Sequence, residues 1–210
     1  VPAVANVLLT SGDPVNSYSA STGTLTGTAI TGSKDAYTLA MANPVSNITI
    51  TADFALWGEK DGAEGSETKP YIISTTAGLD KLAQKVNAGN SYSGKYFKLG
   101  ANIEYDGTEN NFTPIGNSDH SFYDTFDGDG KSISGINISS SSDATHKGIF
   151  GYVSGVGTVK NLVVSNCKIV AEQNIGAIVG KLKGTIENCH VGNDVTLSSG
   201  GAYYAYAGGI

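Results

Sequence analysis

An internal repeat constrains the fold of this chain more than any other feature of its sequence. Residues 157–164 read Gly-Thr-Val-Lys-Asn-Leu-Val-Val and residues 184–191 read Gly-Thr-Ile-Glu-Asn-Cys-His-Val, so matching positions lie 27 residues apart. An earlier segment, residues 131–138, aligns at an offset of 26, which places Ile133 beside Val159. Such a unit is too short for two helices, and its β-branched runs between Gly and Asn suit one β-helix coil, stacked about 4.8 Å from the next. We predict a right-handed parallel β-helix, a solenoid.

The register of the repeat makes predictions for two pairs of side chains. Asn161 and Asn188 occupy matching positions, so their amides should stack as a short asparagine ladder at one corner. Cys189 matches Leu162, whereas Cys167 is displaced from that position by five residues, roughly 16 Å along a strand. That distance exceeds disulfide reach, so we expect two reduced, inward-facing or half-buried thiols.

Charge and composition exclude several classes of protein. The 210 residues include 13 basic residues, all of them lysine, and 19 acidic ones, for a net charge of −6. Nucleic-acid binding needs clustered positive charge, and phosphate recognition commonly uses the arginine fork that this chain lacks. Since 40% of the residues are hydrophobic, a real core is expected, but no apolar run approaches the ~20 residues of a membrane span. We expect no nucleic-acid partner and no membrane insertion.

The pattern changes along the chain indicate three parts. Residues 1–56 alternate β-branched and polar residues between Gly and Pro turns, which predicts a small all-β module, Ig-like or a β-repeat. Residues 57–69 contain little to bury and several charges, as expected of a linker. Residues 70–210 form the β-helix, which we expect to be truncated at its C-terminus, as in an excised fragment of a longer chain.

One segment near the start of the β-helix is helical in pattern. Apolar residues recur at helical spacing at Leu79, Leu82, Ala83 and Val86. Thr75 or Thr76 can serve as the N-cap, Asp80 suits the positive end of the first turn, and Gly89 ends the segment. A short α-helix here can cap the open end of the solenoid, which would otherwise expose core and sheet edges.

Glycine-flanked hydrophobic motifs precede the repeats. They read Gly148-Ile-Phe-Gly151, Gly176-Ala-Ile-Val-Gly180 and Gly208-Gly-Ile210. With the ordered lead-in that begins at Pro70, residues 69–210 resemble bacterial surface proteins with GLUG repeats. Residues 37–54 are similar to the closing strands of small β-repeats in bacterial cell-wall proteins, although Pro44 follows Met41 by three residues rather than one. The resemblance implies an extracellular, cell-surface-attached protein and gives the four motif glycines a structural role.

Three aspartates are the candidate metal ligands. Asp124, Asp127 and Asp129 lie within six residues, next to glycines, and spaced carboxylates of this kind can bind Ca²⁺. A tight turn that uses Asp and Gly for their backbone conformations explains the same residues. Because the complete EF-hand spacing is absent, we expect no metal or other cofactor, with calcium as the one alternative.

Tyrosines near the end of the chain are the candidate binding residues. Tyr203, Tyr204 and Tyr206 offer flat amphipathic faces that can stack on a sugar or a protein partner. The alternative is that they pack the solenoid core and cover its surface.

The chain carries few signs of catalysis. It has no Asp-Asp pair and no arginine, and its three histidines, His120, His146 and His190, are scattered without metal-ligand spacing. The sequence therefore predicts a non-catalytic adhesion or display segment of a bacterial surface protein, with a glycan or host surface protein as ligand and neighbouring repeats of a longer parent chain as partners. Two alternatives remain: a pure structural spacer, and a carbohydrate-active β-helix enzyme or its accessory module.

Overall fold

The computed structural model describes most of the chain from residue 62 onward. Before residue 62 it describes mainly the strands. The described residues are 3–10, 15–20, 24–28, 34–41, 50–54, 57, 62–139, 145–199 and 207–208. The chain divides into two compact units, Val1–Ala63 and Glu64–Ile210. In the second unit, the backbone N–H of Tyr96 donates to the carbonyl of Gly65 at 2.9 Å. The expected boundaries of the module and linker, at residues 56 and 69, stay predictions.

The first unit is all-β in its described residues. Its strands are β1 (Ala3–Thr10), β2 (Val15–Ala20), β3 (Thr24–Thr28), β4 (Lys34–Met41) and β5 (Ile50–Phe54). Strands β1, β4 and β3 form one antiparallel sheet, and β2 pairs antiparallel with β5. This agrees with the small all-β module that the alternating pattern predicts.

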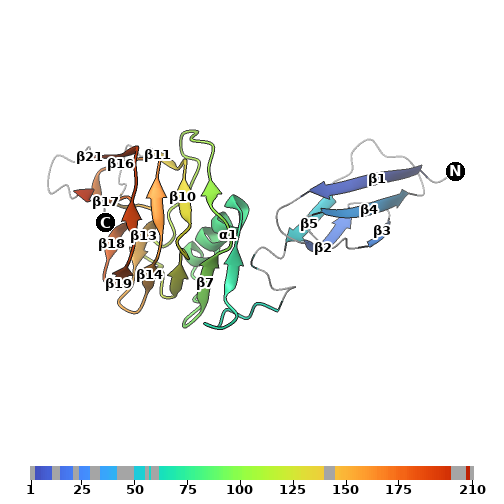
Figure 1. Ribbon diagram of the computed structural model, residues 1–210. Coiled ribbons are helices and arrows are strands. Elements are labelled where there is room, and N and C mark those ends of the chain that lie inside the picture. The colour runs from blue at the N-terminus through green and yellow to red at the C-terminus, as the bar shows by residue number, and fades with distance from the viewer. Residues whose placement is uncertain are drawn as a thin grey trace. The chain divides into compact units, whose positions relative to one another are not determined.

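The second unit contains a single helix and many short strands (Figure 1). The elements are β6 (Tyr71–Ile73), α1 (Thr76–Asn87), β7 (Tyr96–Leu99), β8 (Ile103–Glu104), β9 (Thr125–Asp127), β10 (Ser132–Ser134), β11 (Asn137–Ser139), β12 (Thr145–Lys147), β13 (Phe150–Val153), β14 (Thr158–Lys160), β15 (Val163–Ser165), β16 (Cys167–Ala171), β17 (Gln173–Gly176), β18 (Val179–Leu182), β19 (Thr185–Glu187), β20 (His190–Val191), β21 (Val195–Ser199) and β22 (Ala207–Gly208).

These strands build a parallel β-solenoid of about four turns. Its sheets run β6-β7-β9-β14-β19, β8-β10-β15-β20, β11-β16-β21, β12-β17-β22 and β13-β18, with parallel pairing throughout. Neighbours within a sheet come from successive coils, so each sheet grows along the stack. The predicted parallel β-helix is therefore confirmed.

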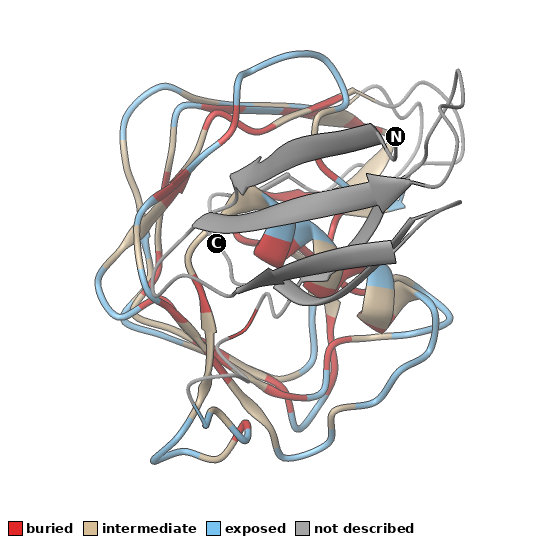
Figure 2. Cartoon of the chain, turned by 90° about the vertical axis from the view of Figure 1, so that its right-hand side faces the viewer, coloured by how far each residue is buried: buried red, intermediate tan, exposed pale blue. Residues whose placement is uncertain are grey.

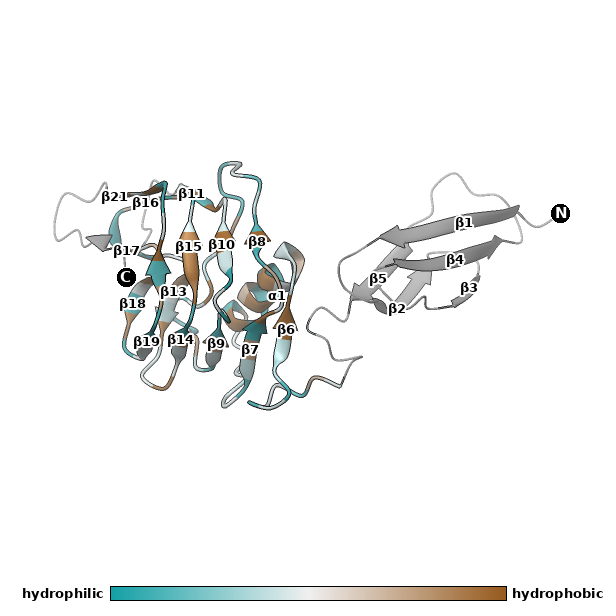
Figure 3. Ribbon diagram, viewed as in Figure 1, coloured by the Kyte–Doolittle hydropathy of each residue, from teal (hydrophilic) through white to brown (hydrophobic). Residues whose placement is uncertain are grey.

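The core consists of inward-facing residues that stack from coil to coil. Phe97 pairs with Phe126, Phe126 with Val159 and Val159 with Ile186. The first three are fully buried, and the ring of Phe126 lies 5.1 Å from that of Phe150. Figure 3 shows hydrophobic colouring on β6, which belongs to the same sheet as this column, and on β8 and β15 of the sheet β8-β10-β15-β20. Burial of large side chains in continuous columns supplies the main driving force for folding such a unit.

Helix α1 lies at the β6–β7 end of the coils (Figure 1) and inside their outline in the turned view (Figure 2). Thr75 is its N-cap, and the side chain accepts a hydrogen bond from the backbone N–H of Gly78 at 3.1 Å. The expected role of Asp80 in the first turn is wrong, because the first turn holds no acidic residue. The Asp80 carboxylate instead accepts a hydrogen bond from Tyr105, at 2.7 Å.

The earliest copy of the repeat aligns differently from the expectation. Ile133 stacks on Val164, 31 residues later, and Val159 stacks on Phe126 rather than on Ile133. The 27-residue offset holds between β14 and β19, where Val159 pairs with Ile186. The error has a physical cause: strand cores must stack in register, but each corner between them tolerates extra residues. The coil that contains residues 131–138 is therefore longer. The spacing of its hydrophobic residues nevertheless matches that of residues 157–164, which produced the wrong alignment.

The motif glycines lie where successive coils approach one another closely. Gly176 pairs with Gly208, and a Cβ atom on Gly148 would lie 2.7 Å from the carbonyl oxygen of Gly176. A Cβ atom on Gly180 would lie 2.5 Å from a backbone nitrogen of the preceding coil, and one on Gly151 would also meet backbone. Real Cβ atoms do not come this close to backbone atoms, so packing accounts for Gly148, Gly151 and Gly180.

Candidate functional site

The asparagine ladder lies on the surface of the solenoid. Asn188 Nδ2 donates to Asn161 Oδ1 at 2.9 Å, and Asn161 Nδ2 donates to Asp127 Oδ1 at 2.9 Å. Both asparagines have positive φ angles, 52° at Asn161 and 49° at Asn188, which Asn tolerates well. The stacking agrees with the predicted register, but Asn188 is exposed. The ladder therefore stabilises a surface corner and is weaker than a buried ladder.

The two cysteines are free thiols. Val163 pairs with His190, so Cys189 stacks on Leu162 as the repeat predicts. Cys167 is buried, and burial raises its thiol pKa to about 11. Cys189 is half-buried, and its pKa is raised mainly by desolvation. Neither environment favours a thiolate, so neither cysteine has the character of a nucleophile.

The candidate tyrosines Tyr203, Tyr204 and Tyr206 lie outside the described residues. Their role in binding stays a prediction.

Asp124 is a buried carboxylate with a single hydrogen bond among the described residues. Its residue is 3% exposed, and its Oδ1 accepts a hydrogen bond from the backbone N–H of Lys95 at 3.3 Å. Desolvation raises the pKa of Asp124 to about 6, opposed by that hydrogen bond.

The other two aspartates are engaged by lysines and by the turn itself. Asp129 Oδ1 lies 2.8 Å from Lys98 Nζ, and Asp129 Oδ2 lies 2.6 Å from Lys131 Nζ. The backbone N–H of Asp129 donates to Asp127 Oδ1 at 2.8 Å, and Asp129 has a positive φ of 52°. Among the described residues, no three His, Cys, Asp or Glu side chains converge for a metal. The contacts of Asp127 and Asp129 are those of a tight turn, and calcium binding stays the untested alternative.

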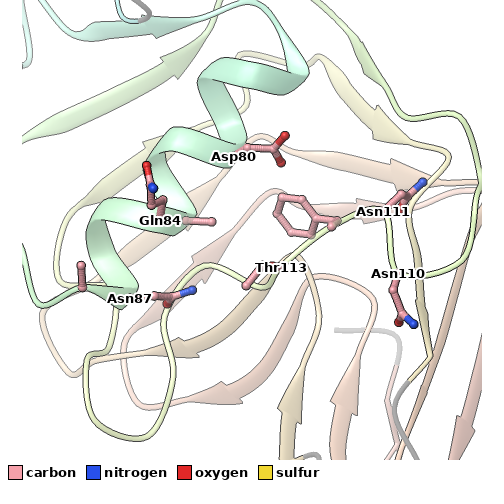
Figure 4. Close-up of a pocket in the computed structure, with 9 residues that line it drawn as sticks. Asp80, Gln84, Asn87, Asn110, Asn111 and Thr113 are labelled. Carbon is pink, nitrogen blue, oxygen red and sulfur yellow. The ribbon is translucent and has the colours of Figure 1, made fainter. Parts of the chain in front are cut away.

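A hollow in the described part of the chain lies between α1 and the loop before the Ile115 bridge (Figure 4). It has a volume of about 590 Å³ and is lined by Asp80, Ala83, Gln84, Asn87, Ala88, Asn110, Asn111, Phe112 and Thr113. We call it the α1 groove. Its walls are therefore mainly amides, a carboxylate and small apolar surfaces.

Two asparagines on the groove walls are held in place by backbone groups. Asn87 Nδ2 donates to the carbonyl of Pro114 and its Oδ1 accepts from Gly116 N–H, both at 2.9 Å. Asn111 Oδ1 accepts from Asn137 N–H at 2.9 Å. These contacts join α1, the loop and the next coil, so the groove is preformed.

Gln84 and Thr113 complete the groove with exposed polar side chains. Figure 4 shows Gln84 on α1 and Thr113 on the facing loop. No hydrogen bond of the described residues occupies the Gln84 amide. It is consequently able to donate to and accept from a ligand.

Two smaller depressions continue from the α1 groove. The first, of about 290 Å³, is lined by Thr76, Asp80, Glu104, Tyr105, Asp106 and Asn111. The second, of about 410 Å³, shares Glu104, Tyr105 and Asp106 with it and reaches Gly135 and Asn166. Shared lining residues make the three hollows a polar track across the surface of the coils.

Two carboxylates on this track have opposite environments. Partial burial raises the pKa of Asp80, although the hydrogen bond from Tyr105 opposes that shift. Hydrogen bonds from Thr108 and Asn111 lower the pKa of Asp106. Burial, and then the contact with Asp80, raises the pKa of the Tyr105 phenol far above its ordinary value. On this track, Asp80 therefore binds a proton more readily than an ordinary aspartate, and Asp106 binds one less readily.

The sequence analysis did not identify this track. Most of its residues come from α1 and from the loop at 105–113, which belong to no repeat, and Glu104, Gly135 and Asn166 complete it. The one sequence signal is the run of polar residues from Asp106 to Asn111, and such runs are ordinary in loops.

Comparisons with known proteins find relatives that share a part of their length with this chain. Halomucin of Haloquadratum walsbyi is 29% identical over 171 residues, which make up 72% of this chain and 2% of halomucin. A Gly-rich membrane protein of Evansella cellulosilytica is 31% identical over 137 residues, 62% of this chain and 15% of that protein. The chain thus spans a small part of either relative and fits a segment of a surface protein.

No protein-family model and no solved structure matches the chain. Within the described residues, α1 is too short and too polar to cross a membrane.

Proposed function

We propose that this chain is a non-catalytic display segment of a cell-surface protein, in which the solenoid presents the α1 groove to a glycan. The groove is the observation that carries the proposal. Its volume of about 590 Å³ falls within the range of small-ligand sites, roughly 300–1,000 Å³. The adjoining depressions extend it in the manner that a chain-like ligand needs.

The chemistry of the groove suits a hydroxyl-rich ligand. Sugar hydroxyls both donate and accept, and amide and carboxylate side chains such as Gln84 and Asp80 offer matching groups. The amides of Asn87 and Asn111 are already fixed by the backbone. Less conformational freedom is therefore lost when a ligand binds.

The setting of the segment is part of the same proposal. The GLUG-like motifs and the cell-wall-type module imply an extracellular protein attached to the cell surface, and both relatives carry surface-type names. Stacked coils form a rigid support along the chain, so a groove at one coil is presented at a fixed position.

A glycan array with the 210-residue protein tests the proposal, with and without Ca²⁺. Gln84→Ala and Asp80→Asn should each weaken binding to a recognised glycan about five- to tenfold, since the first removes a hydrogen-bonding amide and the second replaces a charged acceptor oxygen with a donor. Gln173→Ala and Asp119→Asn, which change the same residue types outside the groove, should leave the affinity unchanged.

The array also decides between this proposal and a spacer. Absence of binding to any glycan would refute the display of a glycan site and favour the spacer. Equal losses in groove and control variants would place the ligand elsewhere.

A second candidate function is carbohydrate cleavage, and one observation favours it. Asp80 and Asp106 line the same depression while their pKa values are shifted in opposite directions. A carboxylic acid and a carboxylate with such a difference are the pair that glycosidases use. The test is release of reducing ends from every glycan that binds. Turnover abolished by either Asp80→Asn or Asp106→Asn would establish cleavage, and binding without turnover would leave the display function.

A further inference from the structure

A compact group of basic side chains surrounds one tyrosine on the face of the solenoid formed by β12, β13 and β18. Lys181 Nζ lies 4.7 Å from the centre of the Tyr152 ring, and Lys183 Nζ lies 5.9 Å from it. The His146 ring stacks on Tyr152 with 5.9 Å between ring centres and 24° between planes. We call these four residues the Tyr152 cluster.

The fold fixes the cluster through the register of two coils. Tyr152 on β13 pairs directly with Lys181 on β18. The backbone N–H of Lys183 donates to the carbonyl of Val153 at 2.9 Å, which anchors the second lysine beside the same strand. Lys181 and Lys183 belong to the same coil, two residues and therefore roughly 7 Å apart along the chain, whereas His146 and Tyr152 come from the preceding coil.

No acidic group balances this charge among the described residues. The ion pairs found there use Lys69, Lys98, Lys131 and Lys160, and none includes Lys181 or Lys183. Burial and then the positive charges of Lys181 and Lys147 lower the pKa of His146, as expected in a field that is positive overall. A chain of net charge −6 thus keeps an uncompensated basic patch, although like charges repel at this distance.

The aromatic ring makes the patch suitable for binding. Cation–π contact holds an ammonium group over Tyr152 while leaving its remaining N–H groups for a ligand. Held side chains lose less freedom when they meet an anion, so the patch binds more strongly than scattered surface lysines.

We infer that the Tyr152 cluster binds an acidic polysaccharide through carboxylate or sulfate groups repeated along its chain. A polymer with one anionic group per sugar spaces its charges several ångströms apart, and Lys181 and Lys183, two residues apart on one coil, offer a comparable spacing. The net negative charge of the protein disfavours the much denser charge of a nucleic acid. The cluster lies on elements other than those of the α1 groove, so this inference does not depend on that groove.

Direct binding of the 210-residue protein tests the inference. Polygalacturonate supplies carboxylates, dextran sulfate supplies sulfates, and dextran is the neutral control. The test variant is Lys181→Gln with Lys183→Gln. The matched control is Lys81→Gln with Lys168→Gln, which changes the net charge equally outside the cluster. Far-UV circular dichroism compares the folds of the two variants.

We expect at least one acidic polymer to bind at low salt and dextran not to bind at the cluster. Loss of the two cluster lysines should weaken that binding about tenfold and lower the salt dependence, the slope of log K against log salt, by about 1 to 2. The control should change affinity about twofold or less. Which polymer binds distinguishes carboxylate from sulfate recognition.

Three results would overturn the inference. The first is no binding of either acidic polymer, and the second is equal weakening in both double variants, which indicates general attraction by lysines. The third is equally tight binding of inorganic sulfate alone, because a polymer site gains affinity from repeated contacts. Glycan binding at the α1 groove is unaffected by the cluster variant, so failure of one proposal is distinguishable from failure of the other.

Discussion

Replacement of Asp124 by asparagine should stabilise the solenoid at neutral pH. The carboxyl group is buried, has one backbone hydrogen-bond donor and no ion pair among the described residues, and its pKa is raised from 3.8 to about 6. Between these two values the folded chain binds more protons at this site than the unfolded chain does. The contribution of Asp124 to the free energy of unfolding therefore falls as the pH rises through that interval and stays low at pH 7.

The size of the effect follows from the pKa difference. A shift of about two units corresponds to about 3 kcal/mol of unfavourable free energy when the buried carboxylate is ionised. The asparagine oxygen can keep the hydrogen bond from Lys95, but its amide adds a donor that needs a partner, which costs about 1 kcal/mol. We expect Asp124→Asn to raise the free energy of unfolding by about 2 kcal/mol at pH 7 and to have little effect near pH 4.

Urea denaturation at several pH values between 4 and 7 measures this difference. Hydrogen exchange in peptides from residues 95–131 reports the solenoid separately from the first unit. Asp119→Asn, a change at an exposed loop carboxylate, is the control and should leave stability unchanged. An Asp124→Asn variant with the wild-type urea midpoint at every pH would refute the reasoning, because the carboxylate would then be solvated.

Three further predictions concern the core, the ladder and the thiols. Phe126→Ala should lower the free energy of unfolding by about 3–5 kcal/mol in urea titrations, because it empties the centre of a fully buried column; a loss below about 1 kcal/mol would contradict that packing. Asn188→Ala should cost about 1.5–3 kcal/mol in the same assay, since it removes one exposed hydrogen bond to Asn161 and places alanine at a positive φ, and a loss below about 0.5 kcal/mol would contradict both contributions. In native protein at pH 8, iodoacetamide should label Cys189 before Cys167, whose burial raises its pKa to about 11; mass spectrometry that found equal rates would contradict the difference in burial.

The sequence predicted the regular parts of the fold because regular parts repeat. Stacking forces β14 and β19 into register, so Val159 and Ile186 carry the same pattern at a fixed offset. Helix α1 was equally accessible, since its N-cap at Thr75 and its apolar spacing are local signals. The register of strand pairing is harder to predict from the sequence where the corner between two strands changes length. The pairing of Ile133 with Val164 was missed because hydrophobic spacing alone does not count the residues in the corner between strands.

The α1 groove could not be predicted from the sequence for a related reason. Asn87 and Asn111 are ordinary polar residues in the sequence. Packing of α1 brings the Asn87 amide to the carbonyl of Pro114, 27 residues away, and stacking of the loop on the next coil brings Asn111 to Asn137, 26 residues away. Likewise, Tyr152 and Lys181 form no motif along the chain and meet only through the pairing of β13 with β18. In a solenoid, side chains of successive coils are neighbours at an offset that the corners determine. Sites that span coils can therefore be read from the sequence only after the register of every corner is known.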